Sequence, residues 1–286
     1  MTASKVVCIA SYPKSGNTWM RLALQACLNE GRIDALADLS VNGASTFGRL
    51  MFQRLMGLDP SHLTSAEFEE VLPEYLALMA RQGRHVVLLK THGAARMPSG
   101  KPMLRPAVAR LVVHLVRDPR DVAVSWAHHR GRTIDEAIAM MADDTASLGD
   151  LHDPLQHSLP QHLGGWSRHV ESWLDAPEYL RVLTLRYEDR LSDPLGTLAL
   201  AARRAGVPHA RAIIEAAVAA TDFRRVAAME RSNGFRERPR EASRFFRHGR
   251  AGGWRSVLTA DQIARIERDH GTVMRRLGYA LTGGGA

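Results

Sequence analysis

Residues 8–19 read Cys8-Ile9-Ala10-Ser11-Tyr12-Pro13-Lys14-Ser15-Gly16-Asn17-Thr18-Trp19, and this stretch decides the fold. The apolar run at 6–10 predicts a strand buried on both faces of a parallel sheet, which Pro13 ends. Gly16 tolerates backbone angles closed to other residues, so the N–H groups of residues 15–18 are expected to converge on one anion at a helix N-terminus. The stretch therefore predicts a phosphate-binding loop.

The spacing of this loop differs from that of the common nucleotide-binding loop. The Walker signature Gly-x-x-x-x-Gly-Lys-Ser/Thr places its lysine after the second glycine, whereas Lys14 precedes Gly16 and no glycine stands five residues upstream. This argues against an ordinary ATPase or kinase. For the stretch alone, a strand-turn-helix with a merely solvated Lys14 remains an alternative.

Length and composition indicate one large α/β domain. The chain has 286 residues, of which 45% are hydrophobic and 24% charged, and both values are typical of globular proteins. The formal charge of +8 predicts an anionic partner: nucleic acid, a membrane surface or a highly phosphorylated small molecule.

The two cysteines and the lengths of the apolar runs indicate the cellular compartment of the protein. Cys8 and Cys27 fall in the expected first strand and the following helix, as small buried residues in a reducing compartment would. The apolar runs at 86–89 and 111–116 are far shorter than the roughly 20 residues of a membrane span. Since the loop begins near residue 11, we expect no signal peptide or membrane stem and a cytoplasmic protein.

Three further strands are expected to deliver polar side chains at their carboxyl ends, where ligands bind in open α/β sheets. The strand at 85–90 leads to Lys90 and His92, the strand at 111–116 to Arg117, and the strand at 179–186 to Tyr187. Ser125 follows Arg117 on a helix, and the two are suited to clamp a second phosphate. His92 as a hydrogen-bonded loop residue, and Arg117 paired with a neighbouring aspartate, are the structural alternatives.

Helices are expected between these strands. Thr64 with Glu67, and Thr133 with Glu136, have the spacing of capping boxes. Trp166 and Trp173 lie seven residues apart, which favours core packing. The expected helices span 19–28, 64–83, 133–148, 166–173, 193–206, 209–229 and 259 onward.

A basic segment with seven arginines follows at 231–250. A disordered insertion and a nucleic-acid-binding arm are both open readings of such a charge run. The segment ends, however, in a Gly-rich turn that contains Arg247, His248 and Gly249, directly before the last helix. A structured turn of this kind is what a lid over phosphates would look like.

Taken together, these motifs resemble the sulfotransferase family that uses 3′-phosphoadenosine 5′-phosphosulfate (PAPS) as donor, in its cytosolic-type, bacterial small-molecule branch. Five motifs occur in the family's order and spacing across nearly the whole chain. They are Tyr12-Pro13-Lys14-Ser15-Gly16-Asn17-Thr18-Trp19, Lys90-Thr91-His92, Arg117-Asp118-Pro119-Arg120-Asp121-Val122-Ala123-Val124-Ser125, Arg186-Tyr187-Glu188-Asp189 and Arg247-His248-Gly249.

The resemblance implies a single α/β domain at 1–281, with a central parallel sheet flanked by helices as in the P-loop nucleotide kinases, and a flexible tail at 282–286. It implies sulfuryl transfer from PAPS to a hydroxyl or amine of a small-molecule acceptor. His92 would be the general base, with Lys14 and Lys90 beside it and no metal. The donor-binding residues would be Lys14, Ser15, Gly16, Asn17, Thr18, Trp19, Arg117, Ser125, Tyr187, Thr221, Phe223, Phe246, Arg247, His248 and Gly249.

Departures from the family pattern are Asn17 in place of threonine, Gly93 in place of leucine and His248 in place of lysine. An ATP-dependent small-molecule kinase and a basic nucleic-acid-binding protein are the rival functions, and a nucleotide binder without catalysis is a third. Aromatic residues, at 6%, are not interleaved with the basic segment as single-strand binding requires. We therefore expect no nucleic-acid or membrane partner.

The acceptor and the oligomeric state stay open at this point. The dimerisation motif of the animal enzymes is mostly absent around 255–264. The Ala- and Arg-rich composition suggests a GC-rich bacterial genome, in which hydroxylated metabolites or antibiotics are plausible acceptors. Candidate acceptor-pocket aromatics, for which a place in the core is the alternative, are Phe47, Phe52, Trp126 and Phe235.

Overall fold

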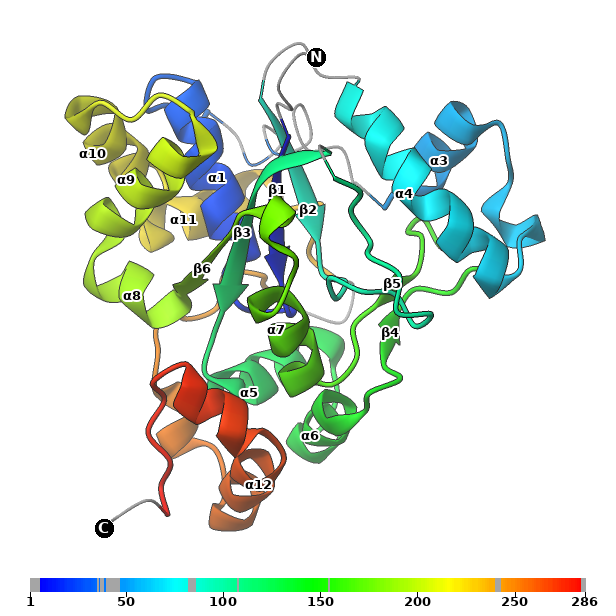
Figure 1. The fold of residues 1–286 in the computed structure, drawn as a ribbon. Coiled ribbons are helices and arrows are strands. Elements are labelled where there is room, and N and C mark those ends of the chain that lie inside the picture. The colour runs from blue at the N-terminus through cyan, green and yellow to red at the C-terminus, as the bar shows by residue number, and fades with distance from the viewer. Residues whose placement is uncertain are drawn as a thin grey trace.

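A parallel four-stranded sheet in the order β2-β1-β3-β6 forms the centre of the computed structural model (Figure 1). The structure describes residues 6–34, 36, 39, 47–81, 86–106, 108–153, 155–239 and 243–283. The expected single α/β domain with a central parallel sheet is confirmed. The strands are β1 (Val6–Ser11), β2 (Val87–Thr91), β3 (Ala109–Val116) and β6 (Val182–Arg186).

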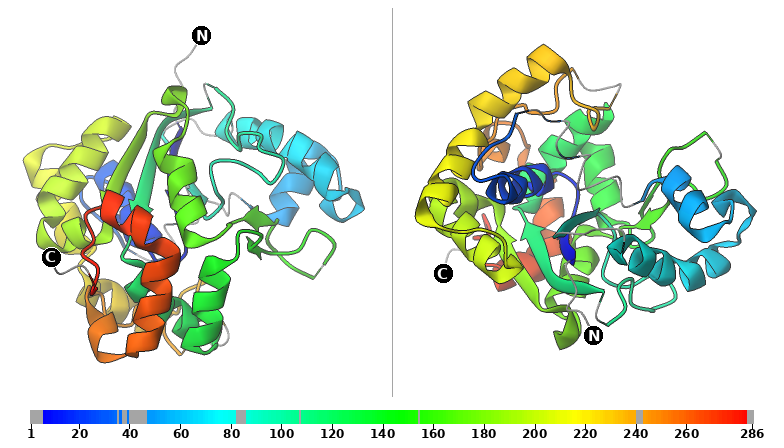
Figure 2. Two further views of the ribbon diagram at one scale, coloured as in Figure 1. Left: turned by 60° about the horizontal axis from the view of Figure 1, so that its bottom comes forward. Right: turned by 90° about the horizontal axis from the view of Figure 1, so that it is seen from above.

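Both faces of β1 are buried, as its unbroken apolar sequence predicts. Side chains alternate between the faces of a strand, so Val7 and Ile9 join one core cluster while Val6 and Cys8 join another. The covering helices lie on opposite sides of the sheet (Figure 2). One side has α1 (Asn17–Leu28), α9 (Pro194–Ala205) and α10 (Arg211–Ala220), and the other has α3 (Arg49–Met56) and α4 (Ser65–Arg81).

A third core cluster forms at the carboxyl ends of the strands, where α5, α6 and α12 gather (Figure 1). Trp166 and Trp173 are fully buried, which confirms their expected role in the core. Both cysteines are buried and free. The helices are α5 (Pro119–Arg130), α6 (Ile134–Ala142), α7 (Trp166–Leu174) and α12 (Ala260–Arg276).

Helix starts follow the sequence closely. Thr64 and Glu67 exchange hydrogen bonds at the start of α4, as do Thr133 and Glu136 at α6, so both expected capping boxes are confirmed. The first helix begins at Asn17, two residues earlier than expected. The expected helix end at Gly83 and strand start at His85 lie outside the described residues.

One expected helix is too long. The helix expected over 133–148 ends at Ala142, because the Asp143 carboxylate accepts hydrogen bonds from the N–H and hydroxyl of Thr145 and turns the chain. Beyond this turn lies a short antiparallel pair, formed by β4 (Ser147–Leu148) and β5 (Gln161–His162).

One further boundary differs from expectation. The strand expected from Tyr179 begins at Val182, since the preceding residues form the 3-10 helix η2 (Glu178–Leu180). The helices expected over 209–229 are α10 and α11 (Phe223–Asn233), and they meet at Thr221, where Asp222 caps α11 through the N–H of Arg224. The remaining short elements are η1 (Pro60–His62), α8 (Tyr187–Ser192) and η3 (Gly253–Ser256).

The expected domain limits stay a prediction, and residues 284–286 of the proposed tail lie outside the described part of the chain. Within the described residues, no helix combines the length and apolar composition that a membrane crossing requires.

Candidate active site

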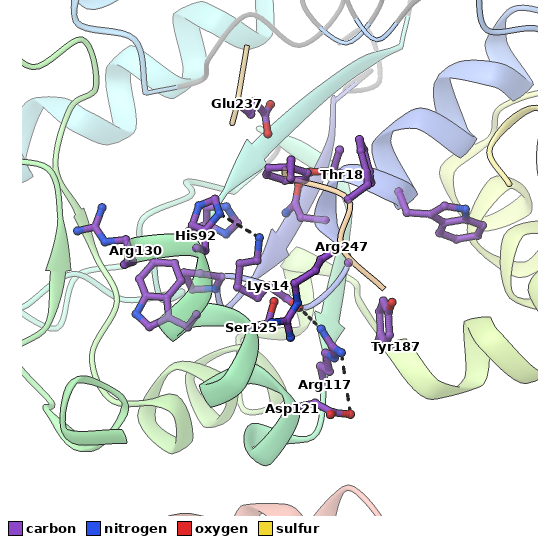
Figure 3. A pocket seen from close by; sticks show the side chains of 18 of the residues that line it. Lys14, Thr18, His92, Arg117, Asp121, Ser125, Arg130, Tyr187, Glu237 and Arg247 are labelled. Atoms are coloured by element: carbon purple, nitrogen blue, oxygen red, sulfur yellow. Dashed lines mark hydrogen bonds and ion pairs between the residues drawn. The ribbon is translucent and has the colours of Figure 1, made fainter. Parts of the chain in front are cut away.

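A cavity of about 550 Å³ is lined by the loops that follow all four strands of the sheet, together with the basic segment (Figure 3). Its position agrees with the expectation that the carboxyl ends of the strands hold the site. The structure brings to this cavity most of the residues that the sequence singled out: Lys14, Gly16, Asn17, Thr18, Trp19, Lys90, His92, Arg117, Ser125, Tyr187, Phe223, Phe246, Arg247, His248 and Gly249.

Two expected donor-binding residues do not line the cavity. The Ser15 side chain is buried, and its hydroxyl has no hydrogen-bond partner among the described residues. The Thr221 hydroxyl is buried and donates to the Ala217 carbonyl oxygen at 2.7 Å, within the last turn of α10. Neither residue therefore lines the cavity, and of the two hydroxyls only that of Thr221 is engaged by a backbone carbonyl among the described residues.

The loop that is expected to bind phosphate is held in place by neighbouring residues of β1, α1 and α8. Gly16 has φ +97°, and a Cβ there would lie 2.9 Å from Cδ2 of Tyr187, so only glycine allows this approach. The Asn17 amide donates to the Ile9 carbonyl at 3.0 Å and accepts from Arg21 Nε at 3.0 Å. The side chain of Asn17 thus holds the loop onto β1 and α1.

Lys14 carries the charge of this loop. Its Nζ donates to His129 Nδ1 at 3.2 Å and lies 4.4 Å from the ring centre of Phe245. Burial lowers the pKa of Lys14 to about 7, with further lowering from the cations Arg117, Lys90 and Arg247. An anion bound in the cavity would restore the charge of this ammonium group.

Arg117 joins the loop to the basic segment. Its guanidinium donates to the carbonyls of Lys14 at 3.1 Å and Arg250 at 3.0 Å, and it covers the ring of Tyr187 at 4.3 Å. The alternative role expected for Arg117, an ion pair with a neighbouring aspartate, corresponds among the described residues only to a 3.9 Å contact with Asp121. Nε of Arg117 is buried without a partner in the described part of the chain, so it retains donor capacity for a ligand.

Arg190 is a cavity residue that the sequence did not reveal. Its guanidinium lies 4.5 Å from the ring centre of Trp19 and 4.9 Å from that of Tyr187. Its Nε is likewise buried without a partner among the described residues. Arginines thus accompany both aromatic rings on this side of the cavity.

His92 has a defined tautomer. Its Nδ1 lies 2.9 Å from the Ser11 carbonyl oxygen, which can only accept, so Nδ1 carries the proton and Nε2 keeps its lone pair. Burial, with a contribution from Lys90, holds the pKa of His92 well below its usual range. At neutral pH the side chain is therefore an uncharged base.

The backbone around His92 is fixed by side chains. The N–H of His92 donates to Gln161 Oε1 at 2.8 Å, and its carbonyl accepts from His169 Nε2 at 3.1 Å. The next carbonyl, of Gly93, accepts from the indole N–H of Trp173 at 3.2 Å. The turn that follows β2 is thus held in one conformation.

Lys90 is paired with Glu237, which comes from the basic segment. Their side chains meet at 2.9 Å, and the same carboxylate accepts from Arg21 at 2.7 and 2.8 Å. Burial raises the pKa of Glu237, but Lys90 and Arg21 outweigh burial and bring it to about 2. Lys90 is therefore held in an ion pair at the wall of the cavity.

The basic segment forms a lid over the cavity, which we define as residues 234–239 and 243–252. Glu230 accepts the N–H groups of Phe245 and Phe246 at 2.7 and 3.0 Å. Asp121 accepts those of Gly252 and Trp254 at 2.6 and 3.0 Å. Buried carboxylates thus anchor this backbone, as expected for a structured lid.

A second cavity of about 390 Å³ adjoins the first, and Gly149 and Gln161 line both. Its apolar lining includes Phe47, Phe68 and Met103. Among the other candidate acceptor aromatics, Trp126 lines the first cavity, Phe52 is fully buried in the core, and Phe235 packs on Phe245 at 4.8 Å.

Sequence reasoning missed Arg190, His129 and Glu237. Arg190 follows Tyr187 by three residues and His129 follows Ser125 by four, so helical spacing would have placed each on the same face as its neighbour. Glu237 reaches its partners across more than 140 residues of sequence, and no local signal marks it.

Within the described residues, no group of three His, Cys, Asp or Glu side chains is arranged to hold a metal ion.

Fold and site together define an α/β protein with a cationic cavity at the carboxyl ends of its parallel strands. The family profile described as sulfotransferase domain matches residues 4–278. The chain therefore belongs to the PAPS-dependent sulfotransferase family, and it is a transferase.

Individual relatives agree with this assignment. Cytosolic sulfotransferase 16 of Arabidopsis thaliana is 27% identical over 277 residues, covering 91% of this chain and 73% of the relative. Sulfotransferase 1A1 of Canis lupus familiaris is 24% identical over 278 residues, covering 96% and 84%. A solved structure of retinol dehydratase, in complex with androsterone and the inactive cofactor PAP, superposes with a TM-score of 0.63 at 21% identity, covering 96% of this chain and 82% of that one.

Proposed function

We propose that the protein transfers a sulfuryl group from PAPS to the hydroxyl or amine of a small-molecule acceptor, with His92 as general base. One observation carries the proposal: Nδ1 of His92 donates to the Ser11 carbonyl at 2.9 Å, so that Nε2 is an uncharged proton acceptor in a cationic cavity. His92, Lys14 and Lys90 are the proposed catalytic residues.

The residues of the cavity fit a nucleotide with several phosphates. Arg117 and Arg190 each retain a buried Nε without a partner among the described residues, and Trp19 offers a ring for an adenine. When bound, PAPS supplies the activated sulfuryl group and a phosphate leaving group. The loop N–H groups with Lys14 would hold the 5′-phosphosulfate, and Arg117, Ser125 and the turn at 247–249 would hold the 3′-phosphate.

Each group has one part in the proposed chemistry. The acceptor oxygen or nitrogen bonds to sulfur, the bond between sulfur and the phosphate oxygen breaks, and the acceptor proton passes to Nε2 of His92. Negative charge grows on the phosphate oxygen, where the Lys14 ammonium stabilises it. Burial lowers the pKa of Lys14 to about 7, so a fraction of the molecules carry an uncharged Lys14 until an anion enters the cavity.

The second cavity is the proposed place for the body of the acceptor. It adjoins the His92 turn through Gly93 and Gln161, and its apolar lining suits a hydrophobic hydroxylated molecule.

The expected cytoplasmic location is supported by the name of the cytosolic Arabidopsis relative.

The first experiment is calorimetric titration with adenosine 3′,5′-bisphosphate (PAP), with ATP and AMP as controls. We expect micromolar or tighter binding of PAP and much weaker binding of AMP, because AMP lacks the 3′-phosphate. A preference for ATP would support a kinase instead. Binding of random DNA at physiological salt, without binding of PAP, would favour a nucleic-acid-binding function.

A further inference from the structure

His129 contacts Lys14 inside the cavity, which both residues line. It lies on α5 one helical turn after Ser125, and its Nδ1 is 3.2 Å from the Lys14 Nζ. Figure 3 shows the Lys14 side chain extending toward the side of the cavity where His92 lies, away from Arg117. The hydrogen bond therefore fixes the direction of the loop ammonium.

Two aromatic residues fix the His129 ring. Trp126 stacks on it with ring centres 5.9 Å apart and an interplanar angle of 22°. Phe245 of the lid meets it edge-on at 5.7 Å and 80°, and the same phenylalanine lies 4.4 Å from the Lys14 ammonium. The imidazole and the ammonium thus share one aromatic wall, and the ring has little freedom to turn away.

His129 is uncharged, so one nitrogen of its ring keeps a lone pair that can accept a hydrogen bond. Burial, followed by Lys14 and Arg130, lowers the pKa of His129 to about 3, so the ring is neutral at physiological pH. Its Nδ1 lone pair can then face an N–H of the Lys14 ammonium. Charged groups from other elements that act on Lys14 are Arg117, Lys90, Arg247 and Glu237.

We propose that His129 is a positioning residue that holds the Lys14 ammonium charged and turned toward His92, where the sulfuryl group passes from donor to acceptor. The catalytic meaning of this assignment rests on the proposed function. The contact itself requires no ligand. Since His129 accepts a hydrogen bond from Lys14 Nζ, the loss of His129 should make the ammonium both less stable and less well directed.

The Lys14–His129 contact can be tested on the ligand-free protein. Competitive acetylation of lysines with acetic anhydride across pH 5–10, read by mass spectrometry, gives the titration of Lys14. We expect His129→Phe to lower the Lys14 midpoint by about one pH unit, the equivalent of one charge-assisted hydrogen bond. His129→Asn, whose Oδ1 replaces Nδ1 as acceptor, should restore it.

The control is His128→Phe, because His128 is the neighbouring histidine of α5 and does not line the cavity. This variant should leave the Lys14 midpoint within about 0.3 pH units of the wild-type value, which is well below the shift expected when one hydrogen bond is lost. His129→Leu replaces the Phe variant if that variant does not fold. An unchanged Lys14 midpoint in a folded His129→Phe or His129→Leu protein would overturn the proposal.

Calorimetry with PAP adds a test of function. At pH 7.5 we expect His129→Phe to weaken PAP binding about fivefold or more, and His129→Asn to bind like the wild type. In a Lys14→Met background, His129→Phe should cause no further loss, since its effect passes through Lys14. An equal additional loss in that background would contradict the proposal. A wild-type protein that does not bind PAP would refute the proposed function, while the acetylation result would still decide the Lys14–His129 contact.

Discussion

Glu237 Oε2 lies 2.9 Å from Lys90 Nζ, so that the lid is joined by an ion pair to the strand that carries the proposed base. The same carboxylate binds Arg21, whose side chain is 2% exposed and which also contacts Asn17 of the phosphate-binding loop. One carboxylate therefore connects the lid, α1 and β2. This connection explains how a segment rich in arginine can lie over a cavity that is itself cationic.

Replacing Glu237 by alanine should destabilise the protein and loosen the lid. The substitution leaves Arg21 buried without its charge partner, which we expect to cost about 2 kcal/mol, less than a fully buried pair because Glu237 is 26% exposed. Urea denaturation measures the loss. The matched control is Glu215→Ala, which removes an exposed ion pair with Arg211 and should leave the midpoint unchanged. Equal midpoints for the Glu237 variant and the wild type would contradict the assigned role.

The contribution of Glu237 should depend on pH. The folded pKa of about 2 is below the unfolded value of about 4.3, so this stabilisation is complete above about pH 4.3 and is lost as the pH falls toward 2. The stability difference between the wild type and Glu237→Gln should accordingly shrink over that interval. A difference that stays constant down to pH 2 would exclude the carboxylate as its source.

Replacing His92 should separate chemistry from binding. In His92→Ala we expect turnover to fall by about 10³, the range of a lost general base, and PAP affinity to change less than about threefold. Because burial holds the pKa of His92 well below its usual range, the wild-type rate should not decline on the acid side until well below pH 6.5. The control is His62→Ala, an exposed histidine outside the cavity. Undiminished turnover in His92→Ala would remove the general-base assignment.

Arg117→Ala should discriminate between two nucleotides. We expect PAP binding to weaken at least about tenfold and AMP binding less than about threefold, because only PAP offers a 3′-phosphate to the guanidinium. Paired titrations in one buffer give both values, and Arg132→Ala, an exposed arginine paired with Glu136, is the control. Since Arg117 also bonds the carbonyls of Lys14 and Arg250, an equal loss for both nucleotides would assign it a purely structural role.

The sheet and most of the cavity could be predicted from the sequence because their signals are local. An unbroken apolar run specifies β1, capping boxes specify the starts of α4 and α6, and the polar residues after each strand follow from parallel topology. Helix ends were less predictable. The turn at Asp143, for example, depends on a single side chain that competes for backbone N–H groups.

The rest of the site depends on tertiary contacts that leave no pattern in the sequence. Ser15 lies inside the expected motif, yet its hydroxyl is buried away from the cavity. Glu237 lies in a segment that reads as a basic arm, yet it supplies the carboxylate that pairs with Lys90 and Arg21. A motif thus predicts which backbone reaches a site, while the direction of each side chain is set by its neighbours in space.

Gly249→Ala should damage the donor site through steric contact. Gly249 has φ +61°, and a Cβ there would lie 2.3 Å from Cδ2 of Phe223, a ring that lines the same cavity. Either the lid turn or the ring must move, so we expect PAP affinity to fall about tenfold or more, as for the loss of one or two charge-assisted hydrogen bonds.

The matched control for this substitution is Gly57→Ala. Gly57 has φ +67° but no atom within 4 Å of an added Cβ, so it shares the backbone strain of about 1 kcal/mol without the clash. Both variants should lose stability in thermal denaturation, Gly249→Ala the more because of its clash, and only Gly249→Ala should lose PAP affinity. If both variants bind PAP like the wild type, the turn at 247–249 does not form part of the proposed donor site. A turn in contact with the 3′-phosphate could not move without a loss of PAP affinity.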